Sequence, residues 1–594
     1  MDRGLTPEQE CFANHGEEAF VMACPGAGKT RTIVERLARI AKTLPPRRGV
    51  AILSFTNTAV EHFAESCETA HLGAYLRFPN FTGTFDAFVR RFLVLPSGID
   101  SSASRPIVVD SWDSLGIEIR LTGAKAFAGP GVCLDDFDPG TNSVDPERIG
   151  MPALRKHVLE HKEDYEIVAK RRRSVLHRAG YLSTADARVE AVKRIRNPLW
   201  KGAVGRALAS RFCELVVDEA QDCNPLDLAI LSWLRGYGLR VTVVCDPDQS
   251  IYEFREGSPS ALLEFAETYR CENRLSFTGN FRSSKAICAL AATLRGREVP
   301  DTALGEASVY TYPVIVATYH GNIGGQIGRL FTERIESKVV GLSRKDGILL
   351  AHRHADALRA SGVPVVAKTA GASRIEAVAR SVAEFWSPSA TAGSRESAVR
   401  AMEKLLLTML GQWKEGEDHS PIRVIERANL NRRELRRQAL DLLMHIPRTC
   451  DNNDGKRAKW VEAVRARIDC LGLTLPPGVT ARKFLCRIGK GEWSKHLREP
   501  ADRNVACSTI HDAKGREYEA VCVVLRPDRA QSNRTSELFD AWETRADLEP
   551  KRVIYVGVTR ARRLVLLAVP EAFGGRCVGI LEKGGVPHER VQLL

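Results

Sequence analysis

A glycine-rich segment at residues 23–30, Ala-Cys-Pro-Gly-Ala-Gly-Lys-Thr, constrains the fold of this chain more than any other feature. The apolar run AFVMAC leads into it, and a helical pattern follows Gly28. A loop of this kind between a strand and a helix lets backbone N–H groups surround phosphate oxygens at the positive end of the helix dipole. It therefore predicts a nucleotide-binding α/β domain, in which Lys29 reaches the terminal phosphates and Thr30 holds magnesium. The loop residues expected at the nucleotide are Gly26, Ala27, Gly28, Lys29 and Thr30.

Two adjacent carboxylates follow a second apolar run, in the segment Leu-Val-Val-Asp-Glu-Ala-Gln-Asp at residues 215–222. The end of a buried strand would deliver these carboxylates to the phosphate site. We expect Asp218 to hold magnesium and Glu219 to activate the attacking water.

Phosphoryl transfer also needs cations that reach the γ-phosphate from outside the loop. Arg282, in Asn-Phe-Arg-Ser-Ser, and Arg560, in Tyr-Val-Gly-Val-Thr-Arg-Ala, are the candidates. Both fall in what we expect to be a second lobe, so the nucleotide would bridge two lobes. For either arginine alone, an ordinary surface salt bridge is the alternative interpretation.

The chain has 594 residues, too many for a single hydrophobic core. Short β-type runs alternate with amphipathic helical stretches, a pattern typical of α/β domains with parallel sheets. Two basic, less regular regions interrupt this pattern. We therefore expect two α/β lobes, each with a mainly helical insertion. The expected boundaries are 1–92 and 206–278 for the first lobe, 93–205 for its insertion, 279–370 and 501–594 for the second lobe, and 371–500 for its insertion.

The charge balance favours a polyanionic partner. The chain carries 86 Lys and Arg against 73 Asp and Glu, a formal net charge of +13. Nucleic acid is the natural partner of such a chain, and solubility alone is the alternative explanation. We found no apolar stretch long enough for a membrane span and no signal-peptide pattern, which predicts a cytoplasmic protein. The 15 scattered cysteines include no CxxC pair, so we expect reduced thiols.

Nine motifs in order resemble those of the UvrD/Rep/PcrA helicases, which are superfamily-one DNA motors. They are LTPEQ from residue 5, the glycine-rich loop, LSFTNTAV from 53, GTFDAF from 83, VVDEAQD from 216, CDPDQSIYEFR from 245, NFRSS from 280, STIHDAKGREYEAV from 508 and VIYVGVTRAR from 553. The resemblance implies two RecA-like motor lobes, ATP and Mg²⁺ as cofactors, and 3′ to 5′ movement on DNA.

The resemblance also implies roles for single residues around the nucleotide. Gln9 would read adenine, Phe281 would stack on it, and Arg31 would help to hold the nucleotide. Gln249 would sense the γ-phosphate, and Glu517 would contact the ribose.

A DNA strand would cross both lobes. The residues that the resemblance places on it are Phe55, Thr56, Asn57 and Thr84 in the first lobe, His511 in the second, and Tyr252 and Phe254, whose rings would stack on bases. Aromatic rings beside a basic groove are what sequence-tolerant binding of single strands requires. A packed core position is the alternative for the two aromatic residues.

The sequence departs from the family pattern at several positions. Asp86 stands where the family has His, and Phe254 stands where it has Trp. An acidic side chain near a phosphate track weakens binding, so Asp86 puts the strand contact at this motif in doubt. The second insertion is also shorter than in the larger family members.

Three further features have a simpler interpretation beside the functional one. The basic run at residues 170–173 could touch duplex DNA, but we favour a solvated helix face. His157 and His161 share a helical face and are interpreted as surface residues, not as a metal pair. Cys24 lies where a helix dipole could lower its pKa, which would suit a redox switch, although loops of this family tolerate varied residues there.

Two functions compete. The first is a 3′ to 5′ DNA helicase acting on single strands and single-strand/duplex junctions in DNA repair, replication restart or antiviral defence. In defence it would work beside a separately encoded nuclease, as Gabija-type helicases do with an OLD-family nuclease. The second is a nucleotide- and DNA-sensing ATPase subunit that gates a partner nuclease without processive unwinding. An RNA helicase fits these motifs less well.

Overall fold

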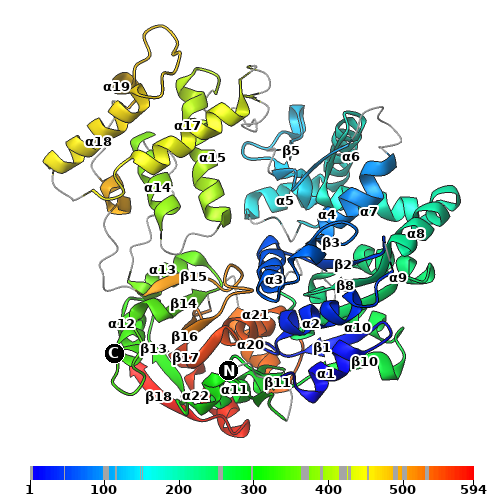
Figure 1. Ribbon diagram of the computed structural model, residues 1–594. Helices are drawn as coiled ribbons and strands as arrows, with labels where there is room; N and C mark the ends of the chain where they lie inside the picture. Colours follow the sequence, from blue (N-terminus) through cyan, green and yellow to red (C-terminus); the bar gives the residue numbers. More distant parts are fainter. Residues whose placement is uncertain are drawn as a thin grey trace.

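A computed structural model describes most of the chain. The described residues are 4–45, 47–97, 106–113, 117–146, 149, 151–251, 259–295, 299–362, 374–387, 392–413, 424–425, 428, 430–450, 454–485, 492–497, 505–528 and 534–593. Figure 1 shows two α/β lobes side by side, with helical segments above them.

The first lobe is built on a six-stranded parallel sheet with the strand order β10-β1-β9-β8-β2-β3. Its strands are β1 (Phe20–Ala23), β2 (Gly49–Ser54), β3 (Phe81–Thr84), β8 (Phe212–Val217), β9 (Arg240–Cys245) and β10 (Arg274–Phe277). Its helices are α1 (Pro7–Asn14), α2 (Lys29–Ala41), α3 (Asn57–Thr69), α4 (Phe85–Phe88), α9 (Pro225–Gly236) and α10 (Pro259–Ala266). Because all six strands are parallel, their carboxyl ends meet at one edge of the sheet, where open α/β sheets bind ligands.

The strands of this sheet are apolar on both faces, and each face packs against a hydrophobic core. Every residue of β2 is buried, as expected for a parallel strand that is covered on both faces. One face packs in a cluster around Phe88, Phe212 and Leu231, and the other in a cluster around Val21, Ile33 and Phe63. This double burial holds the strand ends, and the loops that follow them, in fixed places.

The second lobe has a six-stranded parallel sheet with the order β15-β14-β16-β17-β13-β18. Its strands are β13 (Val314–Tyr319), β14 (Gly347–Ala351), β15 (Ala506–Thr509), β16 (Tyr518–Val524), β17 (Ala561–Pro570) and β18 (His588–Leu593). Its helices are α11 (Lys285–Arg295), α12 (Gln326–Ile335), α13 (His354–Ser361), α20 (Arg534–Thr544), α21 (Glu549–Val558) and α22 (Glu571–Lys583). The short parallel pair β11 (Gly279–Asn280) and β12 (Thr302–Ala303) lies between the last strand of the first lobe and the first strand of the second.

Beyond α4, the described residues between β3 and β8 form further helices and two small sheets. The helices are α5 (Pro152–Glu160), α6 (Lys162–Arg178), α7 (Thr184–Arg196) and α8 (Pro198–Arg211), and the sheets pair β4 (Ile107–Val109) with β7 (Tyr181–Ser183) and β5 (Glu118–Ile119) with β6 (Val132–Cys133). The inner face of α7 packs into the core of the first lobe through Ala187, Ala191 and Val192. This helix therefore fixes the insertion to the lobe.

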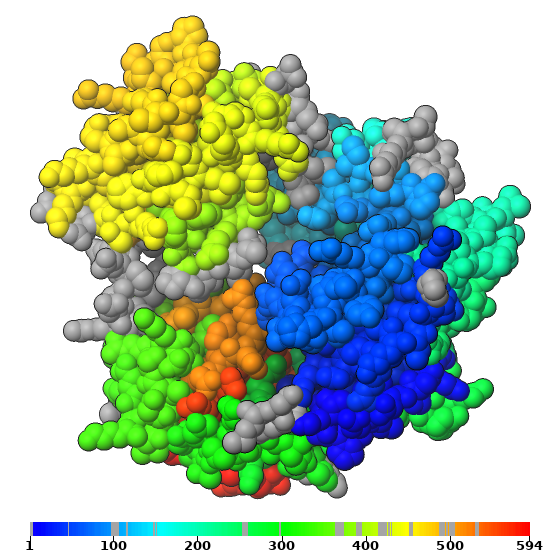
Figure 2. All heavy atoms as spheres, viewed as in Figure 1, coloured from blue at the N-terminus to red at the C-terminus, as the bar shows by residue number. Residues whose placement is uncertain are grey.

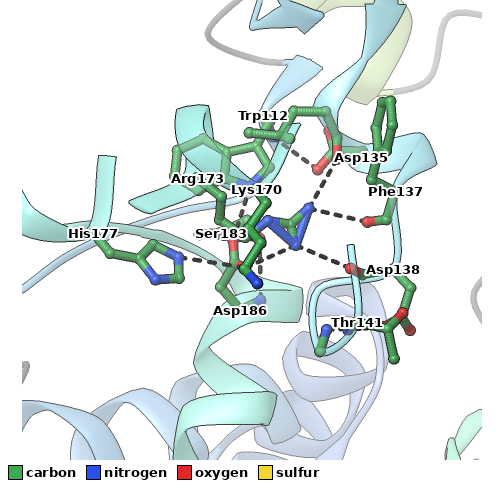
Figure 3. A network of polar contacts seen from close by, with 12 residues as sticks. Trp112, Asp135, Phe137, Asp138, Thr141, Lys170, Arg173, His177, Ser183 and Asp186 are labelled. Carbon is green, nitrogen blue, oxygen red and sulfur yellow. Dashed lines mark hydrogen bonds and ion pairs between the residues drawn. The ribbon is translucent and has the colours of Figure 1, made fainter. Parts of the chain in front are cut away.

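A buried polar network holds this insertion together (Figure 3). The carboxylate of Asp186 on α7 accepts hydrogen bonds from Trp112 Nε1 at 2.8 Å and Ser183 Oγ at 2.6 Å, and it lies 3.3 Å from an Arg173 guanidinium nitrogen. Arg173 also donates to the carbonyl oxygens of Leu134 and Phe137, each at 3.0 Å. The solvated face that we expected for residues 170–173 is therefore wrong for Arg173, which is 4 % exposed.

A separate helical body is inserted into the second lobe. Its helices are α14 (Arg374–Trp386), α15 (Ala392–Met409), α17 (Arg432–His445), α18 (Asp454–Asp469) and α19 (Ala481–Phe484). They bury a core of their own around Leu406, Leu442 and Trp460. In Figure 2 this body, in yellow, stands above the green and orange second lobe.

The α/β fold class with two RecA-like parallel-sheet lobes and helical insertions is confirmed. Among the helices of the described residues, none combines the length and the apolar character that crossing a membrane requires.

Candidate functional site

The glycine-rich loop connects β1 to α2 at the carboxyl edge of the first sheet. Gly26 and Gly28 have φ angles of 71° and 73°, a left-handed conformation that glycine adopts without steric cost. At Gly26 a Cβ atom would lie 2.5 Å from Cβ of Arg282, so the two segments approach too closely for a side chain. The Phe281 N–H donates to the Gly26 carbonyl at 2.8 Å. The loop is thus already joined to the chain segment that begins the second lobe.

The carboxylates Asp218 and Glu219 follow β8 directly opposite this loop. Lys29 Nζ lies 3.1 Å from Glu219 Oε1. Glu219 has a φ of 56°, which is uncommon for a non-glycine residue and is typical of strain at functional sites. The Gln221 side-chain amide donates a short hydrogen bond to the second Glu219 oxygen. Both oxygens of Glu219 are therefore held in place.

Burial and charge act in opposite directions on these groups. Burial favours the neutral form of Glu219, but Lys29 and Lys514 outweigh it and lower the pKa of Glu219 to about 2. Burial, and next the negative charge of Glu219, raise the pKa of Asp218 to about 7. Burial also disfavours the charge of Lys29, yet Glu219 and Asp218 raise its pKa above the ordinary value. A buried Asp218 beside a second carboxylate is a position that a divalent cation would stabilise.

The residues present fit a magnesium nucleotide. Open backbone N–H groups at a helix N-terminus, an ammonium group and hard oxygen ligands are the donor set that phosphates and Mg²⁺ need. Lys29 and Thr30 open α2, and Asp218 lies at the end of the adjacent β8. Among the described residues, no group of three or more His, Cys, Asp and Glu side chains could hold a metal by protein ligands alone.

Two arginines from the other side approach this site. Arg560, at the end of α21, donates to Gln249 Oε1 at 2.8 Å, and Gln249 donates in turn to Asp246 Oδ2 at 2.8 Å. Burial, and next the positive charge of Arg282, lower the pKa of Arg560 to about 9. Arg282 Nε lies 2.7 Å from Glu517 Oε2. A phosphate between the lobes would stabilise both guanidinium charges.

The residues assigned to the base, Gln9 and Phe281, lie beside the loop. Gln9 Nε2 donates to the Ala27 carbonyl at 2.8 Å, while its oxygen accepts from the Thr6 N–H at 3.0 Å as part of the cap of α1. Phe281 lies beside Gly28, where an added Cβ would be 4.0 Å from the ring. Arg31 is exposed on the first turn of α2.

The first-lobe residues assigned to DNA line one groove. Phe55, Thr56 and Asn57 follow β2, and Thr84 ends β3. These residues border a groove of about 940 Å³. The hydroxyls of Thr56 and Thr84 cap α3 and α4 by accepting from backbone N–H groups at 3.2 and 3.1 Å. The opposite wall of the groove belongs to the first insertion.

The charge of this groove differs from the basic character that we expected. Among the residues that the structure describes, eight aspartates and three basic residues line it. Much of this acidity serves local structure, because Asp135 accepts from the backbone N–H groups of Trp112 and Asp113 at 3.0 and 2.7 Å, and Asp138 accepts from that of Gly140 at 3.0 Å. Turn-forming aspartates cannot be recognised as groove lining from the sequence.

In the second lobe, His511 lies on the loop after β15, with its ring 5.5 Å from that of His352. Burial lowers the pKa of His511, and burial together with the charge of Arg534 lowers that of His352 to about 4. Both rings are therefore neutral at physiological pH. The predicted base-stacking residues Tyr252 and Phe254 lie in residues 252–258, outside the described residues.

Two contacts between the lobes were not recognised in the sequence. Lys514 Nζ lies 2.8 Å from both carboxylate oxygens of Asp222. Tyr555 OH donates to Asp246 Oδ2 at 3.0 Å. All four residues are within motifs that sequence analysis identified, but the pairings join segments about 300 positions apart and no local pattern shows them.

Cys24 and the pair His157 and His161 are the other residues for which the sequence left two interpretations. Cys24 is 1 % exposed, and burial raises the pKa of its thiol, which disfavours the reactive thiolate that a redox switch needs. His157 and His161 have ring centroids 4.8 Å apart, and the hydroxyl oxygen of Tyr165 lies 3.2 Å from Nδ1 of His157.

Comparison with known proteins matches two family models to this chain. The model of the UvrD/REP helicase N-terminal domain matches residues 5–97 and 142–270, and that of the UvrD-like helicase C-terminal domain matches residues 490–571. Together they cover just over half of the chain, including the glycine-rich loop, the carboxylates Asp218 and Glu219, and Arg560.

Several curated relatives are similar over long segments. The ATP-dependent DNA helicase UvrD2 of Mycobacterium tuberculosis is 25 % identical over 621 residues, covering 94 % of this chain and 77 % of the relative. DNA helicase II of Escherichia coli is 25 % identical, covering 48 % of this chain and 39 % of the relative. The ATP-dependent DNA helicase PcrA of Leuconostoc citreum is 25 % identical, covering 45 % and 36 %.

Proposed function

Since the chain belongs to the UvrD-like helicase family, we infer that it is an ATP-dependent DNA helicase, and we propose that it moves 3′ to 5′ along single-stranded DNA. The observation that carries the proposal is the hydrogen bond from Arg560 in one lobe to Gln249 in the other, beside Lys29 and Glu219. A nucleotide bound there would contact both lobes. Its hydrolysis can therefore change how the lobes hold a strand.

Each group of the proposed site would have a separate role in ATP hydrolysis. The loop N–H groups and Lys29 would bind the phosphates, and Thr30 and Asp218 would hold magnesium, which supplies positive charge for the phosphate oxygens. Glu219, deprotonated and fixed by Lys29 and Gln221, would accept the proton of the attacking water. Arg282 and Arg560 would neutralise the charge that develops on the γ-phosphate.

Coupling to DNA follows from the positions of the motifs. Gln249 follows β9, three residues before the predicted strand-binding Tyr252. His511 and Lys514 share one loop, and Lys514 pairs with Asp222 near the catalytic carboxylates. We therefore expect small movements at the nucleotide to reach both predicted DNA contacts.

The proposed pathway is DNA repair, the role that the family resemblance implies, with antiviral defence beside a separate nuclease as the alternative. Single strands and single-strand/duplex junctions are the proposed substrates. The acidic lining of the groove on the first lobe would weaken its attraction for the phosphates, which suits movement more than tight storage of a strand.

The first test is steady-state ATP hydrolysis with and without single-stranded DNA, on the wild type and on Glu219→Gln. We expect strong stimulation by DNA and a loss of about a hundred- to ten-thousand-fold in the variant, because the general base is removed. Glu264→Gln, the same change on the exposed face of α10, is the matched control and should behave as the wild type.

Polarity is tested by strand displacement on duplexes with a 3′ or a 5′ single-stranded tail. We expect displacement with the 3′ tail only. Displacement with the 5′ tail only would refute the proposed direction. DNA-stimulated hydrolysis without displacement of either substrate would instead support the sensing subunit that gates a partner nuclease.

A further inference from the structure

A chain of ion pairs crosses the groove on the first lobe. Arg188, on α7 of the first insertion, lies 2.8 Å from Asp227 on α9 and 2.8 Å from Asp86 on α4. The two pairs differ in burial. The side chain of Asp227 is 1 % exposed, whereas that of Asp86 is 41 % exposed. Arg188, whose own side chain is 13 % exposed, is thus held by a buried carboxylate on its inner side and by a solvent-accessible one on its outer side.

The outer pair lies on the proposed DNA path. Asp86 and Arg188 line the same groove as Thr56, Asn57 and Thr84, which are assigned to the strand. Thr84 precedes Asp86 by two residues and caps the helix that carries it. A strand phosphate that contacts the Thr84 segment would therefore come close to the outer side of Arg188.

The guanidinium of Arg188 keeps its charge in this position. Burial disfavours the charge, but the carboxylates of Asp227 and Asp86 outweigh burial and hold its pKa above the ordinary value. A forked guanidinium binds a phosphate through the same two-point geometry that it uses for a carboxylate. Because the Asp86 carboxylate is open to solvent, a phosphate can exchange with it at the guanidinium while the buried Asp227 keeps the side chain in place.

We propose that Arg188 is a DNA-phosphate-binding residue that Asp86 masks, so that a strand phosphate must displace the Asp86 carboxylate to bind there. This inference rests on the proposed function, because it assumes that single-stranded DNA occupies the groove. The exchange makes the contact weak and quickly reversible. A motor that must release each phosphate in turn needs such a contact more than a permanent one.

The test is a double-mutant cycle on binding of fluorescently labelled oligothymidylate, followed by anisotropy without nucleotide. Asp86→Asn should bind the oligonucleotide roughly three- to tenfold more tightly than the wild type, since one charge-assisted contact becomes available. In the Arg188→Ala background the same change should give no gain. A gain of equal size in both backgrounds, or no gain in Asp86→Asn alone, would overturn the inference.

Asp110→Asn is the matched control, because Asp110 is exposed on the same groove and the change removes the same charge. If it tightens binding as much as Asp86→Asn, the effect is a general one of groove charge and the inference fails. The dependence of binding on salt gives a second readout. One additional phosphate contact should steepen the slope of log affinity against log salt by about 0.7 in Asp86→Asn and leave it unchanged in Asp110→Asn.

Loss of Arg188 leaves the buried carboxylate of Asp227 without its cationic partner, which can destabilise the fold. Each variant is therefore checked by thermal melting. If Arg188→Ala does not fold, the cycle is run with Arg188→Ala combined with Asp227→Asn, and the salt slope of Asp86→Asn decides independently. If the wild type itself binds no single-stranded DNA, the proposed function fails with the inference. If the wild type binds and the cycle is additive, only the inference fails.

Discussion

At the scale of single residues, the site depends on side chains that are held before any nucleotide arrives. Glu219 has a left-handed backbone and both carboxylate oxygens engaged, one by Lys29 and one by Gln221. Gln249 is held between Asp246 and Arg560 in the same way. Groups that are already oriented lose little entropy and need little reorganisation at the moment of reaction.

Lys514 illustrates how one residue can join the two lobes. Its ion pair with Asp222 is almost fully buried, with side-chain exposures of 8 % and 6 %. Lys514 also helps to keep Glu219 ionised, after the larger effect of Lys29. Removing one partner of a buried pair leaves an uncompensated charge, which typically costs about 3–5 kcal/mol.

We therefore expect Lys514→Met to lower the turnover number of DNA-stimulated ATP hydrolysis roughly tenfold to a hundredfold, because the catalytic carboxylate is displaced from its productive position. The measurement is steady-state hydrolysis at saturating ATP and DNA. Arg516→Met changes an exposed cation on the same loop and is the control. In the double variant with Asp222→Leu the loss should be no larger than in Lys514→Met. Fully additive losses would show that the two residues act separately.

At the scale of elements, the first insertion is organised by one buried charge. The Asp186 carboxylate accepts hydrogen bonds from Trp112 and Ser183 and pairs with Arg173 (Figure 3). Arg173 in turn donates to the carbonyl groups of residues 134 and 137. The same loop continues into the groove wall at Asp138. The position of this wall therefore depends on helices α6 and α7.

Arg173→Met should destabilise this insertion by about 3–5 kcal/mol, since Asp186 would remain buried without its cation. The effect should appear as a lower melting temperature of the first unfolding transition and as faster hydrogen exchange in residues 132–138. Arg171→Ala, on the exposed side of the same helix, should change stability by less than about 0.5 kcal/mol. Equal effects of the two changes would contradict the structural role of the network.

At the scale of the whole molecule, the nucleotide site belongs to neither lobe alone. The loop and the carboxylates come from the first sheet, and Arg560 lies just after helix α21 of the second lobe. Tyr555 and Arg552 of that same helix also reach across, to Asp246 and to the Ser250 carbonyl. A ligand bound between two bodies stabilises both of them together.

A nonhydrolysable ATP analogue with Mg²⁺ should therefore raise the melting temperature of both lobes in one shared transition. At a free concentration one hundred times its dissociation constant, the gain should be about 2.7 kcal/mol. Lys29→Ala should lose most of this gain because phosphate binding is weakened. A stabilisation that is confined to one transition, or is unchanged in Lys29→Ala, would contradict a site shared by the lobes. Differential scanning calorimetry separates these outcomes.

The sequence by itself determined the chemistry and the fold class. The glycine-rich loop, the carboxylates at 218 and 219 and the alternation of strands and helices are local patterns, and local patterns follow from backbone sterics, strand burial and the helix dipole. These features predicted two parallel-sheet lobes and the residues on the carboxyl edge of the first sheet.

Only the tertiary structure decided which distant residues meet. The pairing of Lys514 with Asp222, of Arg188 with Asp86 and of Arg173 with Asp186 depends on how helices and loops pack around the sheets. The basic run at residues 170–173 looked like one solvated surface, yet helical rotation turned Arg173 inward to a buried carboxylate. Composition gave a net positive chain, but packing placed eight aspartates along one groove, because the three-dimensional fold and not the sum of charges sets the local field.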